Sequence, residues 1–188
     1  KSRPKYGYLP KPVKCHLIIK GPNLLPRARE LFDGTGINIT CTGERHLGAV
    51  IGTEAFKRDF VSSKVENWVK DVEALAKVAM NEPQAAYTGF CKALQHRWTF
   101  TQRTIPGIAD LFLPLENAIR FQLLPALLGR EMSELERRIF ALPLRFGGLG
   151  IPNPSLTSDR AQASEEFIIQ TGTGRSSHSS TPAKTKSV

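Results

Sequence analysis

The spacing of apolar residues changes near residue 53, and this change predicts two regions of different architecture. Before that point the apolar residues come in short runs broken by proline and glycine, which is typical of strands and turns. Beyond it they recur at steps of three to five residues, the spacing of one face of a helix. We therefore expect a small strand layer followed by a set of helices.

The first region should contain three strands and one short helix. Asn23 is placed to cap the helix, which would end at Phe32 with Pro26 in its first turn. Thr42-Gly43-Glu44 reads as a turn. We expect the strands at residues 14–20, 37–40 and 47–51.

The second region should fold into at least four helices. The clearest covers residues 54–81, and a second is expected over 84–101. A strongly apolar helical region follows at 108–129, where Pro114 and Pro125 imply a start, a kink or a split. The apolar stripe of the first of these helices consists of Phe56, Phe60, Val65, Trp68, Val72, Leu75 and Ala79.

The last part of the helical region carries local signals for helix ends. Gly129 is a plausible residue to end the third region, and Ser133 with Glu136 forms a capping-box pattern that opens a fourth helix. A glycine-rich turn segment over residues 142–152 follows. A final helix, capped by Thr157 or Ser158, should reach Gln170.

These elements predict an α+β chain that is predominantly α. We divide it into a strand layer at 1–53, a helical domain at 54–170 and a tail at 171–188. The tail consists largely of Gly, Ser, Thr and Lys, so it cannot form a core and should be disordered.

Composition fits this class and narrows the cellular setting. The chain has 188 residues, of which 40% are hydrophobic and 23% charged, as in ordinary globular domains. No apolar run approaches the roughly 20 residues that span a bilayer, so we expect no membrane association. The first residue is Lys1 and not Met, which suggests a fragment or a processed piece. Three scattered cysteines (Cys15, Cys41 and Cys91) read as free thiols of an intracellular protein, nuclear or cytoplasmic.

The net charge of +9 resides at the two ends of the chain. Residues 1–20 and 171–188 contain basic residues and no acids, whereas the stretch between them is formally neutral. A basic excess suggests an anionic partner. Within the neutral stretch, the acid-free part of the second expected helix carries a polar stripe at helical spacing. This stripe consists of Lys92, His96, Thr99 and Arg103, with Arg97 beside it.

The stripe admits two interpretations. Its cations could follow the phosphates of a nucleic acid, in a contact that depends on salt and not on base sequence. An ordinary solvated helix face would show the same pattern. Trp68, Trp98 and Tyr87 lie on apolar helix faces, which favours core positions over base-stacking platforms.

No pattern in the chain predicts chemistry of its own. The aspartates are scattered, and Gly147-Gly148-Leu149-Gly150 lacks the spacing of a phosphate-binding loop, so it reads as a structural turn. Cys15-His16 and Cys41 with His46 fit no strong zinc pattern. We expect no metal site and no cofactor in this chain.

Three segments, in this order and spacing, carry a resemblance to a known family. They are Gly7-Tyr8-Leu9-Pro10-Lys11-Pro12-Val13-Lys14-Cys15, then Arg45-His46-Leu47-Gly48-Ala49, and then Leu142-Pro143 with Gly147-Gly148-Leu149-Gly150-Ile151. The chain resembles, over about residues 5–155, the C-terminal part of retrotransposon reverse transcriptases of the LINE or DIRS kind. It departs from the family pattern at Lys11, Cys15 and His46, where asparagine, threonine and tyrosine are usual.

The resemblance implies roles for both regions. Residues 1–53 would be a palm remnant and residues 54–170 a thumb-like domain. Lys14 falls on a family lysine that helps to protonate the pyrophosphate leaving group. Leu47, Gly48 and Ala49 fall on the primer grip, a hairpin that holds the 3′ end of the primer. Read from the residues alone, that stretch is better explained as a simple connection between strand and helix.

The implied function is that of a fragment of an RNA-directed DNA polymerase. It would bind RNA–DNA or DNA template–primer duplex and depend on the missing N-terminal palm and fingers of the same polyprotein. The family's catalytic aspartates are not in this chain, so we expect no activity alone and a need for Mg²⁺ only in the complete polymerase. Two alternatives stay open: a stand-alone helical module that binds nucleic acid or protein, and an inactive retroelement remnant.

Overall fold

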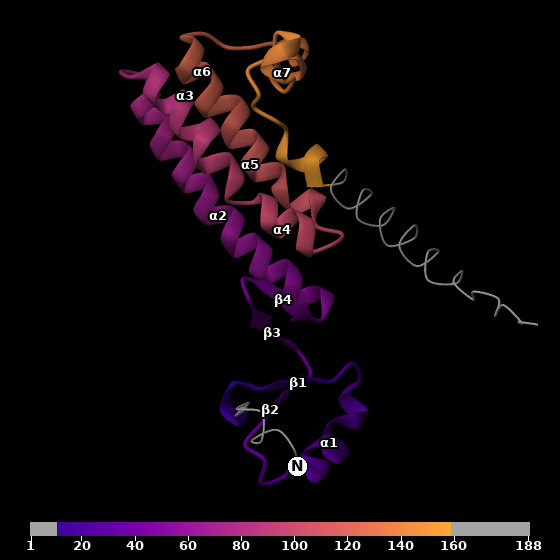
Figure 1. The fold of residues 1–188 in the computed structure, drawn as a ribbon. Helices are drawn as coiled ribbons and strands as arrows, with labels where there is room; N and C mark the ends of the chain where they lie inside the picture. Colours follow the sequence, from indigo (N-terminus) through magenta and orange to yellow (C-terminus); the bar gives the residue numbers. More distant parts are fainter. Residues whose placement is uncertain (1–10, 159–188) are drawn as a thin grey trace, which may run out of the picture.

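A long helix, α2 (Glu54–Ala79), joins the two parts of the structure, a computed structural model that describes residues 11–158 (Figure 1). The helix begins at Thr53, whose hydroxyl oxygen accepts a hydrogen bond from the backbone N–H of Phe56 at 3.3 Å. The helix expected at 54–81 is therefore confirmed. Its buried residues are Val61, Val65, Trp68, Val72, Ala76 and Ala79.

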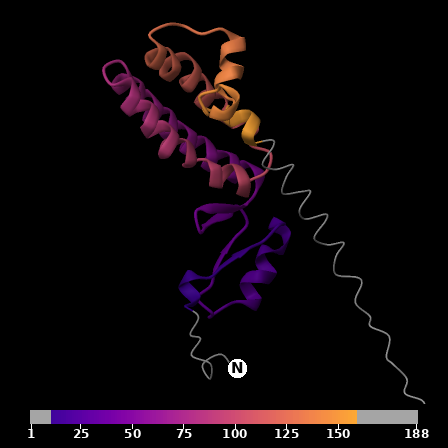
Figure 2. The same cartoon turned by 45° about the horizontal axis from the view of Figure 1, so that its top comes forward.

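Two small sheets precede α2. In the first, β1 (His16–Ile18) pairs in parallel with β2 (Asn38–Thr40), and α1 (Leu25–Leu31) connects them. In the second, β3 (Gly43–His46) pairs antiparallel with β4 (Ala49–Gly52). The views of Figures 1 and 2 place the first sheet and α1 beyond the end of the helical bundle.

Three details of this region differ from the sequence prediction. Asn23 does not cap α1, because a 3₁₀ turn (Pro22–Leu24) leads into the helix and no side chain caps it. The expected turn at 42–44 is instead the start of β3. The strand expected at 47–51 begins only at Ala49, because the chain turns at Leu47 and Gly48. Gly43 stands opposite Gly52, and a Cβ on Gly52 would lie 2.4 Å from the Cα of Gly43. These glycines therefore serve the close approach of two strands.

The helix expected over 84–101 is two helices. α3 (Pro83–Lys92) ends where Ala93 takes φ −127° and ψ −60°, and α4 (Thr99–Thr104) begins after a 3₁₀ turn (Leu94–His96). Buried apolar residues continue at helical steps across the break, at Phe90, Leu94 and Trp98. The apolar pattern therefore contained no sign of the break.

The apolar region at 108–129 forms one helical stretch of changing pitch. A 3₁₀ turn (Ala109–Phe112) leads into α5 (Leu113–Ala118), then a π-helical segment (Ile119–Leu123), then α6 (Leu124–Leu128). Pro114 and Pro125 lie in the first turns of α5 and α6, where the missing N–H costs least. Of the expected alternatives, a start, a kink or a split, the structure shows that each proline marks the start of an α-helical segment.

The predicted helix ends after α6 are mostly confirmed. Gly129 ends α6 with φ +69°, and Ser133 and Glu136 form the capping box of α7 (Glu134–Phe140). A 3₁₀ turn (Leu144–Phe146) then opens the glycine-rich segment. The next helix begins at residue 154 and is capped by Asn153, not by Thr157 or Ser158. The expected continuation of that helix to Gln170 and the tail at 171–188 lie outside the described residues.

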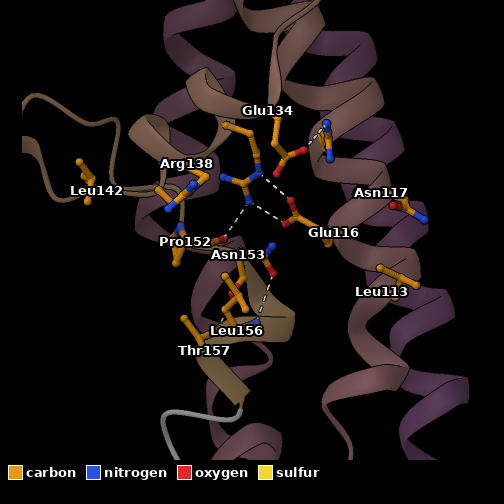
Figure 3. Close-up of a pocket in the computed structure, with 13 residues that line it drawn as sticks. Leu113, Glu116, Asn117, Glu134, Arg138, Leu142, Pro152, Asn153, Leu156 and Thr157 are labelled. Carbon is orange, nitrogen blue, oxygen red and sulfur yellow. Dashed lines mark hydrogen bonds and ion pairs between the residues drawn. The ribbon is translucent and has the colours of Figure 1, made fainter.

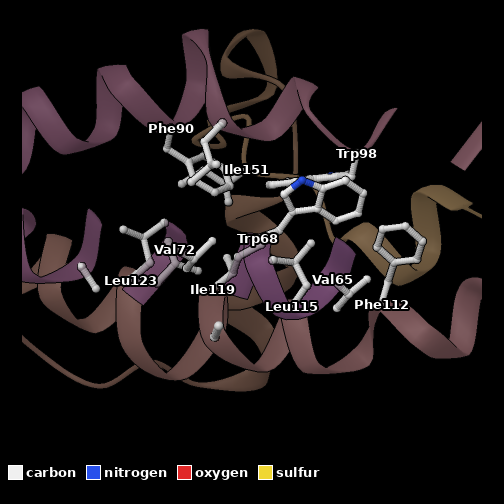
Figure 4. Close-up of a cluster of buried hydrophobic side chains, with 14 of the residues drawn as sticks. Val65, Trp68, Val72, Phe90, Trp98, Phe112, Leu115, Ile119, Leu123 and Ile151 are labelled. Atoms are coloured by element: carbon white, nitrogen blue, oxygen red, sulfur yellow. The ribbon is translucent and has the colours of Figure 1, made fainter. Parts of the chain in front are cut away.

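One core joins the helices to the second sheet (Figure 4). The rings of Trp68 and Phe112 stack with centroids 6.1 Å apart, and Trp98 is tilted against Trp68 and Phe90. Both tryptophans are therefore core residues, as predicted. Val50 of β4 belongs to this core, so the β3–β4 hairpin is fixed to the bundle. The α+β fold with predominant helix is confirmed.

The stretch 109–128 also bears on the membrane question. It spans 20 residues with mean hydropathy 1.2, so by length and composition alone it is apolar enough to cross a bilayer. The sequence expectation of no such run is corrected on this point. Five of its side chains are completely buried in the protein core, which the core helix of a water-exposed fold also requires. They are Phe112, Leu115, Ile119, Leu123 and Leu124.

Candidate nucleic-acid interface

The β3–β4 hairpin turns on two residues, Leu47 and Gly48. His46 pairs with Ala49, and the two turn residues have φ +48° and +86°, as a type I′ turn requires. This turn matches the right-handed twist of the strands but suits Asn-Gly far better than Leu-Gly. The Leu47 side chain is 85% exposed at the tip. The residues expected at the primer grip thus form a hairpin turn and the first residue of β4.

Arg45 of the hairpin contacts α2 through the ring of Phe60, and Lys64 of α2 lies over the same ring. The guanidinium carbon of Arg45 lies 5.7 Å from the centroid of the Phe60 ring, and Lys64 Nζ lies 5.0 Å from the same centroid. Lys64 Nζ is also 5.8 Å from the Trp68 ring. Cations over aromatic faces are attracted by the ring quadrupole. The ring of Phe60 therefore holds two positive charges near each other.

A third cation joins them from the segment before α4. Burial lowers the pKa of Lys64, and the positive charges of Arg45 and Arg97 lower it further. Arg97 is itself held by an ion pair with Asp71 of α2. Arg45, Lys64 and Arg97, which we call the basic face, are therefore contributed by β3, α2 and the entry to α4.

An aromatic residue lies next to this basic face. Phe100 follows Arg97 by one turn of α4, and its side chain is 50% exposed. A Cβ built on Gly48 would lie 3.5 Å from the Phe100 ring, so α4 reaches the tip of the hairpin. Sequence analysis did not single out Phe100 or Lys64, and it named Arg45 only as part of the motif at residues 45–49 and not as a binding cation. These residues are far apart in a formally neutral stretch, and no window along the chain would have grouped them.

The predicted polar stripe is only partly assembled. Lys92 ends α3, His96 ends the 3₁₀ turn, and Arg103 lies in the last turn of α4. All of these side chains and that of Arg97 are exposed. The break at Ala93 distributes the stripe over separate elements, so the expected single helix face is wrong. Of its members, Arg97 is placed within electrostatic reach of Lys64.

Lys14 is exposed but does not lie in a strand. It ends a 3₁₀ turn (Pro12–Lys14), and the strand expected at 14–20 begins two residues later. His16 of β1 approaches Glu44 of β3 at 3.4 Å, which links the first sheet to the hairpin. The proposed part of Lys14 in catalysis stays a prediction.

A hollow lies between α5, α7 and the segment at 152–157 (Figure 3). Its volume is about 520 Å³, and its floor contains the buried ion pair of Arg137 and Glu116, with two N–O distances of 2.6 Å. Arg137 also donates to the carbonyl oxygens of Ile151 and Pro152. The ion pair and these hydrogen bonds therefore attach residues 151–152, which follow the glycine-rich turn, to α5 and α7.

The glycine-rich segment is a turn, as predicted. Gly147 and Gly150 have φ of +77° and +66°, and a Cβ on Gly148 would lie 2.0 Å from the carbonyl oxygen of Leu142. The hydroxyl of Tyr87 donates to the carbonyl oxygen of Leu149 at 2.6 Å. The segment is therefore packed against α3 and α7 by its backbone.

Within residues 11–158 no group of three or more His, Cys, Asp or Glu side chains could hold a metal ion. All three cysteines, which lie in this range, are free thiols, as predicted. Of the two cysteine–histidine pairs considered, one has its histidine engaged with a carboxylate, since His16 approaches Glu44. The residues that the structure describes therefore offer charged and apolar side chains for contact with a ligand.

The chain matches no protein-family model, no curated protein and no solved structure. Its assignment to reverse transcriptases therefore stays a prediction.

Proposed function

We propose that this chain is the primer-grip and thumb part of a retrotransposon-type RNA-directed DNA polymerase, and that it binds template–primer duplex. One observation carries the proposal. The hairpin that contains Leu47, Gly48 and Ala49 leads directly into the long helix α2, and both contribute cations to one basic face. A polymerase thumb joined to its grip needs such a junction.

The electrostatics of the basic face favour an anion. Arg45 and Arg97 add to the burial that lowers the pKa of Lys64, and of these cations Arg97 is paired with Asp71. A phosphate group placed among them would offset their repulsion and favour the charged lysine. Such contacts fix the position of a nucleic-acid backbone without reading its sequence.

The first sheet supports a larger assembly. A two-stranded parallel sheet is marginal alone, because parallel sheets are normally covered on both faces. Here Ile19 is the buried apolar residue of this layer, whereas several apolar side chains in and beside it are exposed. They are Val13, Leu24, Leu31, Phe32 and Ile51. In this proposal the palm and fingers of the same polyprotein cover them, supply the catalytic aspartates and Mg²⁺, and bring Lys14 to the leaving group.

The test is binding of a labelled RNA–DNA template–primer hybrid, measured by fluorescence anisotropy at several salt concentrations. The triple variant Arg45→Ala, Lys64→Ala, Arg97→Ala should bind more weakly. Its plot of log affinity against log salt should be shallower, by up to about 0.9 for each lost phosphate contact. The chain alone should incorporate no nucleotide.

A matched control removes three other exposed charges: Lys70→Ala, Lys77→Ala and Arg138→Ala. Lys70 lines a groove with Asp110, Leu111 and Pro114, and Lys77 follows it by two helical turns. The control has the same net charge as the test variant and should keep the wild-type salt dependence. Equal loss in both variants would mean that net charge, and not the basic face, drives binding. Thermal melting by circular dichroism checks that both variants fold.

A stand-alone protein-binding module is the second candidate, and α7 favours it. Leu135, Ile139 and Leu142 follow one another at steps of four and three residues, and all three are exposed. Such a stripe suits a partner helix. An in-frame Asp-Asp strand motif encoded upstream of Lys1 would favour the polymerase over this module.

A further inference from the structure

The basic face carries an apolar projection at its edge. Leu47 at the hairpin tip is 85% exposed and Phe100 on α4 is 50% exposed. Phe100 packs against the residue that follows Leu47, since a Cβ built on Gly48 would lie 3.5 Å from the Phe100 ring. Arg97 lies one turn before Phe100, and Arg45 lies two residues before Leu47. An exposed aromatic ring is thus placed against the hairpin that carries Arg45 and one helical turn from Arg97.

The backbone at the tip of the hairpin is strained. Leu47 has φ +48°, a left-handed conformation that L-residues other than Gly, Asn and Asp seldom adopt. Asparagine at this position would suit the turn, and a polar residue would suit the exposure. Leu47 adds nothing to the apolar core of the described residues. Strain of this kind accumulates at binding sites and clamps.

We propose that Phe100 and Leu47 form a platform that takes an unpaired nucleobase at the end of the bound duplex. The ring of Phe100 stacks on the base, Leu47 contacts its edge, and the basic face holds the adjoining phosphates. This inference rests on the proposed function, since it places the base beside a bound template–primer. Aromatic stacking flanked by cations is the usual way in which proteins hold unpaired bases, whatever their sequence.

The platform predicts that the chain binds a hybrid with an unpaired end base more tightly than a blunt hybrid. A hybrid with one unpaired 3′ nucleotide offers a base that is free to stack, whereas a blunt hybrid must first unpair one. Stacking on an aromatic side chain contributes about 1–3 kcal/mol per base, so the overhang hybrid should bind at least about fivefold tighter. The preference should not depend on which base is unpaired.

The experiment compares blunt and one-nucleotide-overhang hybrids by anisotropy, using the full chain. A second pair carries 2-aminopurine as the unpaired base, whose fluorescence reports stacking. The wild type should prefer the overhang and quench the 2-aminopurine. Phe100→Ala and Phe100→Leu should abolish both effects and keep the affinity and salt dependence for the blunt hybrid. Phe100→Trp should retain the preference.

Phe121 supplies the matched control. It is 63% exposed on the π-helical segment and has Arg120 over its ring, so it is also an exposed phenylalanine beside a cation. Phe121→Ala should change neither the preference nor the quenching. Because both phenylalanines are exposed, both variants should melt close to the wild type.

The outcomes separate this inference from the proposed function. Equal binding of blunt and overhang hybrids by the wild type would overturn the platform and leave duplex binding in place. The same holds if Phe100→Ala keeps the preference, or if Phe121→Ala loses it equally. Failure of the wild type to bind any hybrid at low salt would overturn both.

Discussion

The buried ion pair between Arg137 and Glu116 allows a quantitative test of the fold. Their side chains are 4% and 7% exposed, and the guanidinium also donates to the carbonyl oxygens of Ile151 and Pro152. Glu116→Leu leaves a buried guanidinium without its counter-charge, and Arg137→Met leaves a buried carboxylate and two carbonyl groups without their donor. Breaking a buried pair from one side costs about 3–5 kcal/mol.

The double variant should be much less destabilised than the sum of the single variants. With both charges replaced by apolar side chains of similar size, no uncompensated charge is left, and such replacements are often neutral. The carbonyl groups of Ile151 and Pro152 still lose a donor, which costs about 1–3 kcal/mol for each group that stays dry. We therefore expect a coupling free energy of several kcal/mol between the two positions.

Urea unfolding, followed by far-ultraviolet circular dichroism and by the fluorescence of the buried Trp68 and Trp98, measures these free energies. A domain of this kind is stable by only about 5–15 kcal/mol, so each single variant should lower the urea midpoint markedly. The exposed pair of Arg130 and Glu136 is the control, and Arg130→Ala should shift the midpoint little. Single variants of the buried pair that shift it no more than Arg130→Ala would refute the reasoning.

Three further predictions follow from local geometry. Leu47→Asn should raise the free energy of unfolding by about 1 kcal/mol, because it replaces a left-handed leucine by the residue that a type I′ turn prefers; it should also weaken binding of the overhang hybrid. Gly148→Ala should lower the free energy of unfolding by at least about 1–3 kcal/mol, because its Cβ would lie 2.0 Å from the Leu142 carbonyl oxygen. Urea unfolding measures the stability of the Leu47→Asn and Gly148→Ala variants. The pKa of Glu136 is lowered to about 2, first by its hydrogen bond from Arg130 and then by the Ser133 N–H. Because a lowered carboxyl pKa stabilises the fold above the ordinary value near 4.5, this contribution should be lost as the pH falls from about 4.5 to 2, and the thermal midpoint of Glu136→Gln should lack it.

Each of these has an informative control. Gly147→Ala meets no atom within 4 Å and is strained only by its φ of +77°, so it should cost less than Gly148→Ala. Leu47→Ala keeps the left-handed strain, so it should not reproduce the gain in stability of Leu47→Asn. A pH dependence of Glu136→Gln equal to that of the wild type would assign the acid transition to other carboxylates.

Features set by a few neighbouring residues could be predicted from the sequence. Helix α2, the capping box of Ser133 and Glu136 and the end of α6 at Gly129 were all predicted correctly. The two prolines were expected to mark a start, a kink or a split, and they mark the starts of α5 and α6. In each case the deciding physics is local: helical spacing, a side-chain cap, a left-handed glycine or a missing N–H. The overall class, a small strand layer followed by helices, follows from the same signals.

Features that depend on contact between distant segments were missed. The sequence did not reveal the break at Ala93, because Phe90, Leu94 and Trp98 keep helical spacing across it. It also placed a turn at Gly43, which instead lies in a strand opposite Gly52. Glycine occurs both in turns and in strands that another strand approaches closely, so Gly43 alone does not distinguish the two. The pairing of Gly43 with Gly52 decides for the strand.

The residues of the candidate site also fall into two groups, those that the sequence indicated and those that only the tertiary structure brought together. The residue pattern placed a strand at 47–51, and a hairpin at Leu47 and Gly48 was expected only from the family resemblance; the pattern did indicate one of the cations, Arg97. Only the tertiary structure brought Arg45 and Lys64 to that cation and placed Phe100 against the hairpin tip. Coulomb forces and stacking act through space and not along the chain. A stretch that is neutral along the sequence can therefore fold with a strongly basic face.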